Sequence, residues 1–408
     1  MKKVVWIWQC LTWMIVVCLF CCNFREASCV VEAAPTPDPS LPRILHVNIA
    51  DQMCGGAAEI IFSLCKKLIE KKYYVKVVAS RGSPFHHELK KRGIPCIDVD
   101  VHWPKNSNAN LAKELEEICR REAIDIINVH KPWDYDAAKI VAKKLGIGSV
   151  AFYHSYEMPT HRYFNGFDAV FSVNPQIVVR LQQEKDASEV VEFMNPPFDE
   201  GRLLSFKAQR DRKTFFRDVF RVAIKDCPLI CMVANLYPCK NHALLLKAAS
   251  IIINREHIPV QLALAGADST GEKTKMMELV RSLKIQDYVY FLGYTKEVPE
   301  LLFHADMAVL PSKFESFGIV VLEAALMKKP VIVSKNCGVA GCFVEHGING
   351  LVIDPDSEQD LAKAIKRILT DTPFARVLGQ NAFERALMCF STEAAVAKVE
   401  KVYQAIGG

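Results

Sequence analysis

From residue 43 onward, short runs of apolar and β-branched residues alternate with longer stretches whose apolar positions recur at helical spacing. The first half of the chain carries the runs RILHVNIA, YYVKVVA, IPCIDVDV, IDIINVH, SVAFYH and DAVFSVN. The second half repeats the alternation with PLICMVAN, PVQLALAG, DYVYFLG, DMAVLPS, KPVIVS and NGLVID. This alternation predicts βαβ units with parallel sheets, which is an α/β fold.

The stretches between the runs have the spacing of helices that pack on one face. The stretch GGAAEIIFSLCKKLIEKK, residues 55–72, is typical, with apolar side chains at Ile60, Ile61, Leu64, Cys65, Leu68 and Ile69. The connection at residues 199–226 is charged and contains one amphipathic patch. That patch leaves two interpretations open, a helix packed on the second half or a helix on a membrane surface.

The chain is long enough for two cores, since 408 residues exceed the usual size of a single one. We expect a Rossmann-like domain at residues 43–205 and a second one at residues 206–390. The final stretch, residues 391–408, has helical spacing but no strand after it, and we expect a helix that crosses between the domains. Ligands of such sheets bind beyond the carboxyl ends of the strands, so the expected site is a cleft between the two domains.

A hydrophobic segment precedes the folded part. Lys2 and Lys3 are followed by residues 4–22, in which Gln9 and Thr12 are the only clearly polar side chains, and this length suits a helix that spans a bilayer. The Pro-rich stretch VEAAPTPDPSLP predicts an extended tether. Residues 1–42 are therefore expected to lie outside the fold as a membrane anchor and tether, with a cleaved signal peptide as the alternative.

Composition removes several classes of function. The net charge of +5 is too small to indicate nucleic-acid binding, and no basic tract is interleaved with aromatic residues, so we expect no nucleic-acid partner. The fifteen cysteines contain no two pairs at the spacing of a zinc site, and we expect no structural metal.

One stretch of the second half, PSKFESFGIVVLEA, places Glu315 and Glu323 eight positions apart around a Ser-Phe-Gly step. The part GIVVLEAALMKK is expected to be a helix that is capped by Ser316 and stops before Pro330. Gly318 lets a ligand approach the backbone closely, and the unpaired N–H groups of the first turn predict a phosphate site. Eight residues at helical rise span about 12 Å, roughly the reach from the ribose to the sugar of a nucleotide-diphosphate sugar. Taken alone, the pair is also explained by a capping glutamate and a solvated helix glutamate.

This stretch resembles the E-x7-E motif of the retaining glycosyltransferases of glycosyltransferase family 4. The resemblance continues through LALAGAD, VYFLGYTKEVPELLFHADMAVL, MKKPVIVS and HGINGLVI, and it covers residues 43–406, most strongly residues 229–370. It implies the GT-B fold, in which two Rossmann-like domains with parallel sheets face each other. It also implies transfer of a sugar from a nucleotide donor with retention, without a required metal and without any other cofactor.

Carried onto this sequence, the resemblance implies that Glu315 contacts the donor sugar and Glu323 the ribose, while Phe317 and Gly318 lend backbone N–H groups. Lys240 in ANLYPCKNH is similar to the lysine that neutralises the donor diphosphate. An ammonium suits that place because the leaving group gains negative charge as it departs.

Further residues complete the expected site. His154 ends the run SVAFYH, where the family has a pocket histidine, and we expect it to be catalytic together with Glu315 and Lys240. His130 ends the preceding run, where a structural hydrogen bond is the alternative. The remaining expected donor-binding residues are Ser316, Asn235, Gly266 of LALAGAD, and Gly55 and Gly56 of DQMCGGAAE, which resemble the family's glycine loop.

The sequence departs from the family pattern in two places. Asn235 stands where the commonest form has an arginine, so either backbone amides or another basic residue must replace that cation. The stretch CGVAGCFVEHG lacks the glutamate that is often found near Gly341 or Cys342. Asp98 and Asp100 superficially match the metal-binding Asp-x-Asp of another glycosyltransferase fold, but that fold has no E-x7-E helix.

We therefore expect a membrane-tethered glycosyltransferase that moves a hexose-type sugar from a UDP- or GDP-sugar to a glycan, lipid-linked or other acceptor. The alternative is a non-catalytic GT-B subunit that binds sugar nucleotides or a partner enzyme. Lys2 and Lys3 favour catalytic domains outside the cell. The supply of sugar nucleotides and the absence of Asn-x-Ser/Thr sites favour the cytosolic side, which we expect. A lumenal or periplasmic enzyme behind a cleaved signal peptide remains the alternative.

Overall fold

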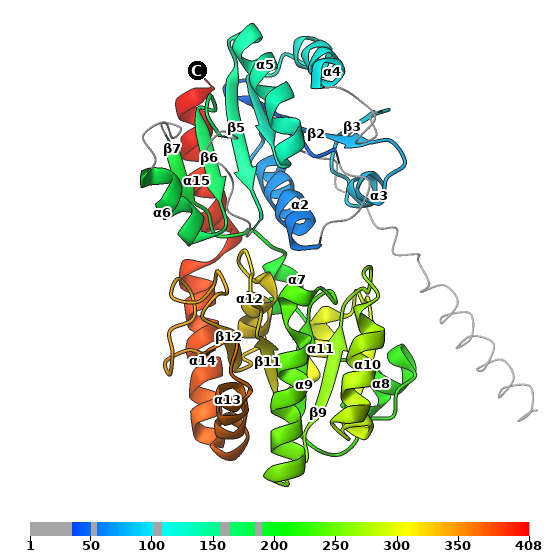
Figure 1. Ribbon diagram of the computed structural model, residues 1–408. Helices are drawn as coiled ribbons and strands as arrows, with labels where there is room; N and C mark the ends of the chain where they lie inside the picture. The colour runs from blue at the N-terminus through cyan, green and yellow to red at the C-terminus, as the bar shows by residue number, and fades with distance from the viewer. Residues whose placement is uncertain (1–34, 50–54, 101–107, 156–163, 184–189, 408) are drawn as a thin grey trace, which may run out of the picture. The chain divides into compact units, whose positions relative to one another are not determined.

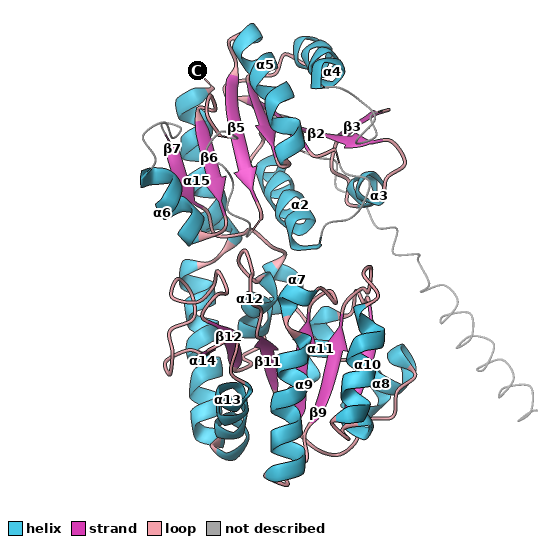
Figure 2. Ribbon diagram, in the orientation of Figure 1, coloured by secondary structure: helices cyan, strands magenta, loops and turns pink. Residues whose placement is uncertain are grey.

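Two parallel β-sheets, one from each half of the chain, organise the protein (Figures 1 and 2), and one cluster of buried apolar side chains runs through both halves. The computed structural model describes residues 35–49, 55–100, 108–155, 164–183 and 190–407. The first sheet has the order β3-β2-β1-β4-β5-β6-β7. Its strands are β1 (Arg43–Val47), β2 (Tyr74–Ser80), β3 (Cys96–Val99), β4 (Ile126–Val129), β5 (Gly148–Tyr153), β6 (Ala169–Ser172) and β7 (Val190–Phe193). The helices between them are α2 (Gly55–Glu70), α3 (Pro84–Lys91), α4 (Asn108–Arg121), the short η1 (Pro132–Asp134), α5 (Tyr135–Leu145) and α6 (Pro175–Gln183).

The second sheet has the order β10-β9-β8-β11-β12-β13. Its strands are β8 (Leu229–Val233), β9 (Gln261–Ala265), β10 (Val289–Gly293), β11 (Met307–Leu310), β12 (Val331–Ser334) and β13 (Leu351–Ile353). The helices of this half are α9 (His242–Ser250), α10 (Glu272–Ser282), α11 (Val298–His304), α12 (Ile319–Leu326), α13 (Glu358–Thr370) and α14 (Thr372–Cys389), with short helical turns η3 (Pro238–Lys240), η4 (Ile251–Arg255) and η5 (Gln286–Tyr288). Three more helices connect or follow the halves, namely α7 (Glu200–Leu204), α8 (Arg212–Phe220) and α15 (Thr392–Ile406).

Each apolar run of the sequence contains a strand, because helices on both faces of a parallel sheet require strands that are apolar on both sides. Strands β4, β6, β8 and β11 show this most clearly, since nearly all of their residues are buried. Strand β7 was not among the predicted strands. It is a partly buried edge strand, so its hydrophobic signal is weak.

The strand order reverses between β1 and β4 in the first sheet and between β8 and β11 in the second. Such a reversal opens a crevice beyond the carboxyl ends of the strands, where ligands of α/β sheets bind. Residues Pro37–Gly408 form one compact unit, so the domain boundaries drawn at residues 205 and 390 stay predictions.

The amphipathic patch of the connection forms α8. Phe215 and Phe216 are fully buried in this helix, and Arg210 just before it donates from Nε to the buried carboxylate of Glu300 on α11 at 3.0 Å. Because its aromatic side chains lie in the core, α8 packs on the second half, and the membrane-surface interpretation of this patch was wrong.

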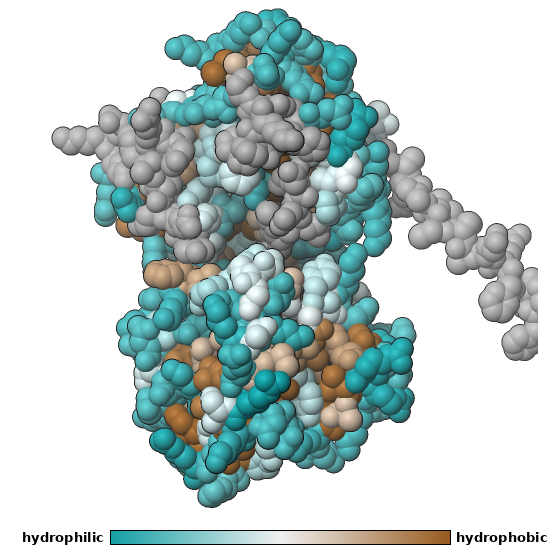
Figure 3. Space-filling view, turned by 45° about the vertical axis from the view of Figure 1, so that its right-hand side comes forward, coloured by the Kyte–Doolittle hydropathy of each residue, from teal (hydrophilic) through white to brown (hydrophobic). Residues whose placement is uncertain are grey.

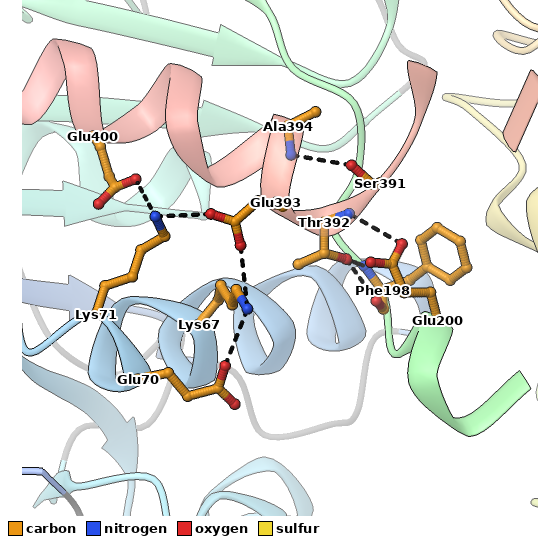
Figure 4. Close-up of polar contacts among 10 residues, drawn as sticks. All are labelled: Lys67, Glu70, Lys71, Phe198, Glu200, Ser391, Thr392, Glu393, Ala394 and Glu400. Carbon is orange, nitrogen blue, oxygen red and sulfur yellow. Dashed lines mark hydrogen bonds and ion pairs between the residues drawn. The ribbon is translucent and has the colours of Figure 1, made fainter. Parts of the chain in front are cut away.

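Helix α15 packs against α2 of the first half (Figure 4). Lys71 Nζ lies 2.8 Å from Glu393 Oε1 and 3.0 Å from Glu400 Oε2, and Lys67 Nζ lies 3.2 Å from Glu393 Oε2. These ion pairs join α15 to α2, which is the first helix of the described residues.

The chain passes between the two halves at two places, and these places are hydrogen-bonded to each other (Figure 4). Thr392 Oγ1 donates to the carbonyl of Phe198 at 2.7 Å and accepts from its N–H at 3.1 Å. The N–H of Thr392 donates to Glu200 Oε2 at 3.1 Å. Helix α7 is thereby held at the junction of the two halves.

Hydrophilic residues cover most of the described surface on the face drawn in Figure 3, and apolar residues form scattered groups on the C-terminal half. Among the described residues, no helix has the length and apolar character needed to cross a bilayer. The predicted anchor at residues 4–22 lies outside the residues that the structure describes.

Candidate functional site

Residues from both halves of the chain line one cleft of about 880 Å³. The cleft includes every predicted site residue except Gly55, which opens α2 beside it: Gly56, His154, Asn235, Lys240, Gly266, Glu315, Ser316, Phe317, Gly318 and Glu323. The structure therefore brings together residues that are up to 267 positions apart in the sequence, from Gly56 to Glu323. Their contacts with a ligand stay predictions.

Lys240 and Glu315 form a close ion pair in the cleft, with Lys240 Nζ 2.6 Å from Glu315 Oε2. Lys240 ends the turn η3. This turn is bonded to the segment that carries Glu315, because the carbonyl of Cys239 accepts the N–H of Lys313 at 2.8 Å. Burial disfavours the charged form of Lys240, but the charge and hydrogen bond of Glu315 outweigh it and raise the pKa of the lysine. The site therefore keeps a cation at neutral pH.

Asn241, which the sequence analysis did not single out, fixes this turn. It adopts a left-handed conformation with φ of 61°, which asparagine tolerates better than most residues. Its buried Nδ2 donates to the carbonyls of Pro311 and Pro355 at 3.2 and 2.8 Å. Asn241 thus fixes the backbone next to Lys240 against the ends of β11 and β13.

Helix α12 begins at Ile319, and Gly318 is its N-cap residue with φ of 100°. The predicted cap by Ser316 was wrong, since no side chain caps this helix. The positive φ is what requires glycine here, and a Cβ would in addition press on Leu310 Cδ2 at 2.8 Å. The first amides of a helix have no intrahelical acceptor, and among the described residues no other acceptor bonds to those of Gly318, Ile319 and Val320. All three residues line the cleft, and the phosphate site expected at these N–H groups stays a prediction.

The segment before the helix is extended rather than helical. Glu315 forms an isolated β-bridge with Cys337, and Gly338 donates its N–H to the carbonyl of Glu315 at 3.1 Å. The 12 Å span between the two glutamates rested on helical rise throughout, and that premise was wrong, because only the part from Ile319 to Glu323 is helical. Gly338 was missed, although a Cβ there would lie 1.9 Å from the carbonyl oxygen of Ser316.

Phe317 contributes to the core rather than to the cleft surface. Its side chain is 2% exposed and packs between the rings of Phe193 and Phe390, with centroids 6.3 and 6.0 Å away. Phe317 is still among the residues that line the cleft, so its buried ring anchors the glutamate segment to the core.

Glu323 lies one helical turn inside α12. Burial raises the pKa of its carboxyl to about 7, and the nearby charge of Arg202 opposes part of that rise. Arg202 Nη2 lies 3.8 Å from Glu323 Oε1, and the arginine side chain is 47% exposed in the cleft. No local sequence pattern marks Arg202, because packing of α7 against α12 brings it there.

Asn235 and Gly266 form the floor of the cleft at the ends of β8 and β9. Asn235 Oδ1 accepts the N–H of Ala267 at 3.0 Å, which leaves the amide nitrogen of Asn235 as the donor that a ligand would meet. A Cβ on Gly266 would lie 2.0 Å from the carbonyl oxygen of Ala234, so the close approach of the two strand ends requires glycine.

The first half contributes Gly56 and His154. A Cβ on Gly56 would lie 3.2 Å from Ile319 Cδ1, which places this glycine beside the start of α12. His154 Nε2 lies 3.0 Å from Nδ1 of His130, whose Nε2 lies 2.9 Å from Nδ1 of His46. His130 thus contacts the cleft residue His154 but does not line the cleft itself, which is consistent with the alternative of a structural hydrogen bond.

Asp98 and Asp100 do not line the cleft. Arg81 pairs with both of them, at 3.0 Å from Asp98 Oδ2 and 2.7 Å from Asp100 Oδ1. In the described part of the chain, His, Cys, Asp and Glu side chains form no group of three or more that would hold a metal ion.

Comparison with protein families gives two matches that divide the chain as its two sheets do. The family described as Glycosyltransferase Family 4 matches residues 54–191, and the family described as Glycosyl transferases group 1 matches residues 216–385. The chain is 25% identical over 366 residues to the N-acetyl-alpha-D-glucosaminyl L-malate synthase of Bacillus anthracis, covering 86% of this chain and 93% of that protein. It is 26% identical over 377 residues to the UDP-Gal:alpha-D-GlcNAc-diphosphoundecaprenol alpha-1,3-galactosyltransferase of Escherichia coli, covering 88% and 96%.

Solved structures share the fold. The Anabaena protein Alr3699/HepE, solved in complex with UDP and glucose, superposes with a TM-score of 0.75 at 20% identity and covers 89% of this chain and 100% of its own. A glycosyltransferase from Rickettsia africae superposes with a TM-score of 0.78 at 20% identity, covering 90% and 99%. These matches confirm the expected pair of Rossmann-like domains with parallel sheets.

Proposed function

This chain belongs to glycosyltransferase family 4 and has the GT-B fold, and from that membership we propose that it transfers a hexose-type sugar from a nucleotide-diphosphate sugar with retention of configuration. The observation that carries the proposal is the pair of Lys240 and Glu315 beside the free N–H groups at the start of α12. A diphosphate fits between a fixed ammonium and a helix N-terminus. The sugar and the ribose on either side of it would then meet Glu315 and Glu323.

The proposed reaction breaks the bond between the anomeric carbon and the diphosphate oxygen. Negative charge then develops on the departing diphosphate, where Lys240 and the amides of Gly318 and Ile319 stabilise it. The acceptor hydroxyl attacks the anomeric carbon from the same face, and its proton passes to the departing diphosphate. No metal is assigned to this step, since the lysine and the helix amides supply positive charge at the leaving group.

Arg202 supplies the cation that Asn235 does not. It lines the cleft, it is only 3.8 Å from Glu323, and Glu323 follows the free amides by one turn. The other arginine of the cleft, Arg92, is already held by Glu59 through two hydrogen bonds of 2.9 and 2.8 Å. Arg202 is therefore the freer of the two to turn toward a diphosphate.

UDP is favoured over GDP as the nucleotide of the donor. The E. coli relative is named for a UDP-sugar, and the Anabaena structure contains UDP. Hydrogen bonds donated by ribose hydroxyls to Glu323 would serve either nucleotide, so the glutamates do not decide the base.

A lipid-linked acceptor at the cytosolic face of a membrane is the proposed second substrate. Residues 4–22 have the length and apolar character of an anchor, and the name of the E. coli relative includes a diphosphoundecaprenol acceptor. Protease added to sealed vesicles with the cytosolic side inward should leave the folded part intact. Digestion before lysis would instead place it on the lumenal or periplasmic side.

A donor screen tests the proposed function. Purified full-length protein is incubated with UDP- and GDP-sugars and with lipid-diphosphate-linked saccharides, in the presence of excess chelator, and nucleotide release is measured. Release of UDP from one donor, with the anomeric configuration retained in the product, is expected. Release that requires added Mn²⁺ or Mg²⁺ would overturn metal independence, and binding of sugar nucleotides without release would support the non-catalytic alternative.

A further inference from the structure

Three histidine side chains from neighbouring strands form a continuous chain of hydrogen bonds that leads into the cleft. His46 lies on β1, His130 directly follows β4 and His154 directly follows β5, and these strands are adjacent in the first sheet. His46 Nδ1 lies 2.9 Å from His130 Nε2, and His130 Nδ1 lies 3.0 Å from His154 Nε2. The planes of successive rings differ by only 16° and 21°. His46 is fully buried, whereas His154 lines the cleft, so the chain connects the core with the site.

Burial keeps the three rings neutral. It lowers the pKa of His46 and of His154 to about 3, and it also lowers the pKa of His130, to which the neighbouring histidines and Lys131 add. Each ring therefore carries one proton at neutral pH, so that one of its nitrogens donates and the other accepts.

This rule leaves only two arrangements for the whole chain. In the first, every proton lies on Nδ1, so His46 donates to His130, His130 donates to His154, and Nδ1–H of His154 is left to donate to a ligand. In the second, every proton lies on Nε2, and Nδ1 of His154 is a bare acceptor. The proton position in the cleft is thereby tied to the proton position on His46, two rings away.

The two end nitrogens of the three hydrogen-bonded histidines show where a ligand can bind. Among the described residues, His154 Nδ1 and His46 Nε2 are buried and have no hydrogen-bond partner. The cleft is at the His154 end only. A bound diphosphate brings negative charge to that end, and negative charge favours the arrangement that points an N–H toward it.

We propose that His46 and His130 are positioning residues that hold His154 with its proton on Nδ1, so that His154 donates a hydrogen bond to an oxygen of the bound diphosphate. The identity of that ligand rests on the proposed function, but the hydrogen bonds among the three histidines do not. A purely structural role is the competing explanation, since the His130 ring also packs on Phe152 with centroids 5.2 Å apart. The two explanations differ in one respect, because ring packing does not fix which nitrogen carries the proton.

Nuclear magnetic resonance of the full-length protein labelled with ¹⁵N at histidine separates them. In the ligand-free protein we expect scalar couplings between nitrogens across both hydrogen bonds. On addition of UDP we expect His154 to be protonated at Nδ1 alone. His46→Phe, which keeps an aromatic ring but removes its nitrogens, should abolish one coupling and shift His154 to a mixture of both tautomers, although His46 does not line the cleft.

His304→Phe is the matched control, since His304 is also buried among aromatic rings but is not one of the three hydrogen-bonded histidines. It should leave the couplings and the His154 tautomer unchanged. Absence of both couplings in the unsubstituted protein would overturn the proposal without any variant, and so would an unchanged His154 tautomer in a folded His46→Phe protein. Failure of UDP to bind would count against the proposed function, whereas the couplings are measured without it.

Discussion

Lys240 Nζ lies 2.6 Å from Glu315 Oε2, so the cation proposed for the leaving group is already held by the carboxylate proposed for the sugar. An ammonium has three N–H donors, and one of them is used by Glu315, which leaves two for a diphosphate. The pair thus places the ammonium in the same cleft as the anion site predicted at the start of α12, and the ammonium keeps N–H donors for a diphosphate. It also makes the two residues interdependent, since the charge and hydrogen bond of Glu315 raise the pKa of the partly buried lysine against the effect of burial.

Replacement of Glu315 by Gln should separate binding of the nucleotide from transfer of the sugar. The variant keeps the shape of the side chain but loses the charge that orients Lys240 and meets the sugar. We expect turnover to fall by about 10²-fold, as misplacement of a reacting group does, while UDP still binds. Steady-state kinetics and calorimetry with UDP measure the two effects. Glu278→Gln, at an exposed position on α10, is the control, and a Glu315→Gln protein with unchanged turnover would leave Glu315 with a structural role only.

Donor binding should depend on pH through Glu323. The pKa of this carboxyl is raised to about 7, so it is protonated below that pH and becomes a carboxylate, able to accept two ribose hydroxyl hydrogens, above it. Affinity for a UDP-sugar should therefore increase as pH rises through about 7, and Glu323→Gln should flatten the profile. Arg202→Ala should move the midpoint upward, because it removes the cation that opposes the rise in pKa. The same pH profile in the protein and in Glu323→Gln would contradict this assignment.

Gly338→Ala should disturb the site from outside it. A Cβ at this position would lie 1.9 Å from the carbonyl oxygen of Ser316, and a backbone atom cannot move away without displacing the glutamate segment. We expect a loss of about 1–3 kcal/mol in the free energy of unfolding together with a loss of turnover. Denaturant unfolding and kinetics measure both. Gly201→Ala, in helix α7 where the nearest atom would be 3.7 Å away, should leave the free energy of unfolding unchanged or raise it by up to about 1 kcal/mol, and equal losses from the two substitutions would refute the steric argument.

The sequence predicted the strands well, because burial on both faces demands apolar runs that stand out locally. Strand β11, fully buried, lies where DMAVL predicted it, whereas the edge strand β7 is half solvated and was missed. The cap of α12 was predicted wrongly for a tertiary reason. Ser316 has the chemistry of a cap, but the bridge of Glu315 to Cys337 holds this segment extended until Gly318.

Sequence motifs predicted the residues of the cleft, whereas the contacts of these residues with distant parts of the chain are seen only in the folded structure. Arg202 reaches Glu323 through packing of α7 on α12, and no pattern near either residue signals it. The histidine chain depends in the same way on the register of three adjacent strands, which sets His46 beside His130. The local sequence shows which secondary structure a segment favours and which chemical groups it carries. Contacts between distant segments depend on the strand register and helix packing of the folded protein.

The central claim is that Lys240 stabilises the departing diphosphate, and the step in which the diphosphate departs tests it most directly. Lys240 should matter more in the transition state than in the ground state, because the diphosphate gains charge as the glycosidic bond breaks. Lys240→Ala should therefore slow the chemical step more than it weakens donor binding. Lys247→Ala, at an exposed position on α9, should change neither quantity.

Single-turnover kinetics of Lys240→Ala, with the dissociation constant of the donor measured in parallel, tests this most directly. The proposed mechanism predicts a chemical step slower by about 10²–10³-fold with a smaller change in the dissociation constant. A weaker dissociation constant with an unchanged chemical step would contradict it, because Lys240 would then be a binding contact and not the group that stabilises the departing diphosphate.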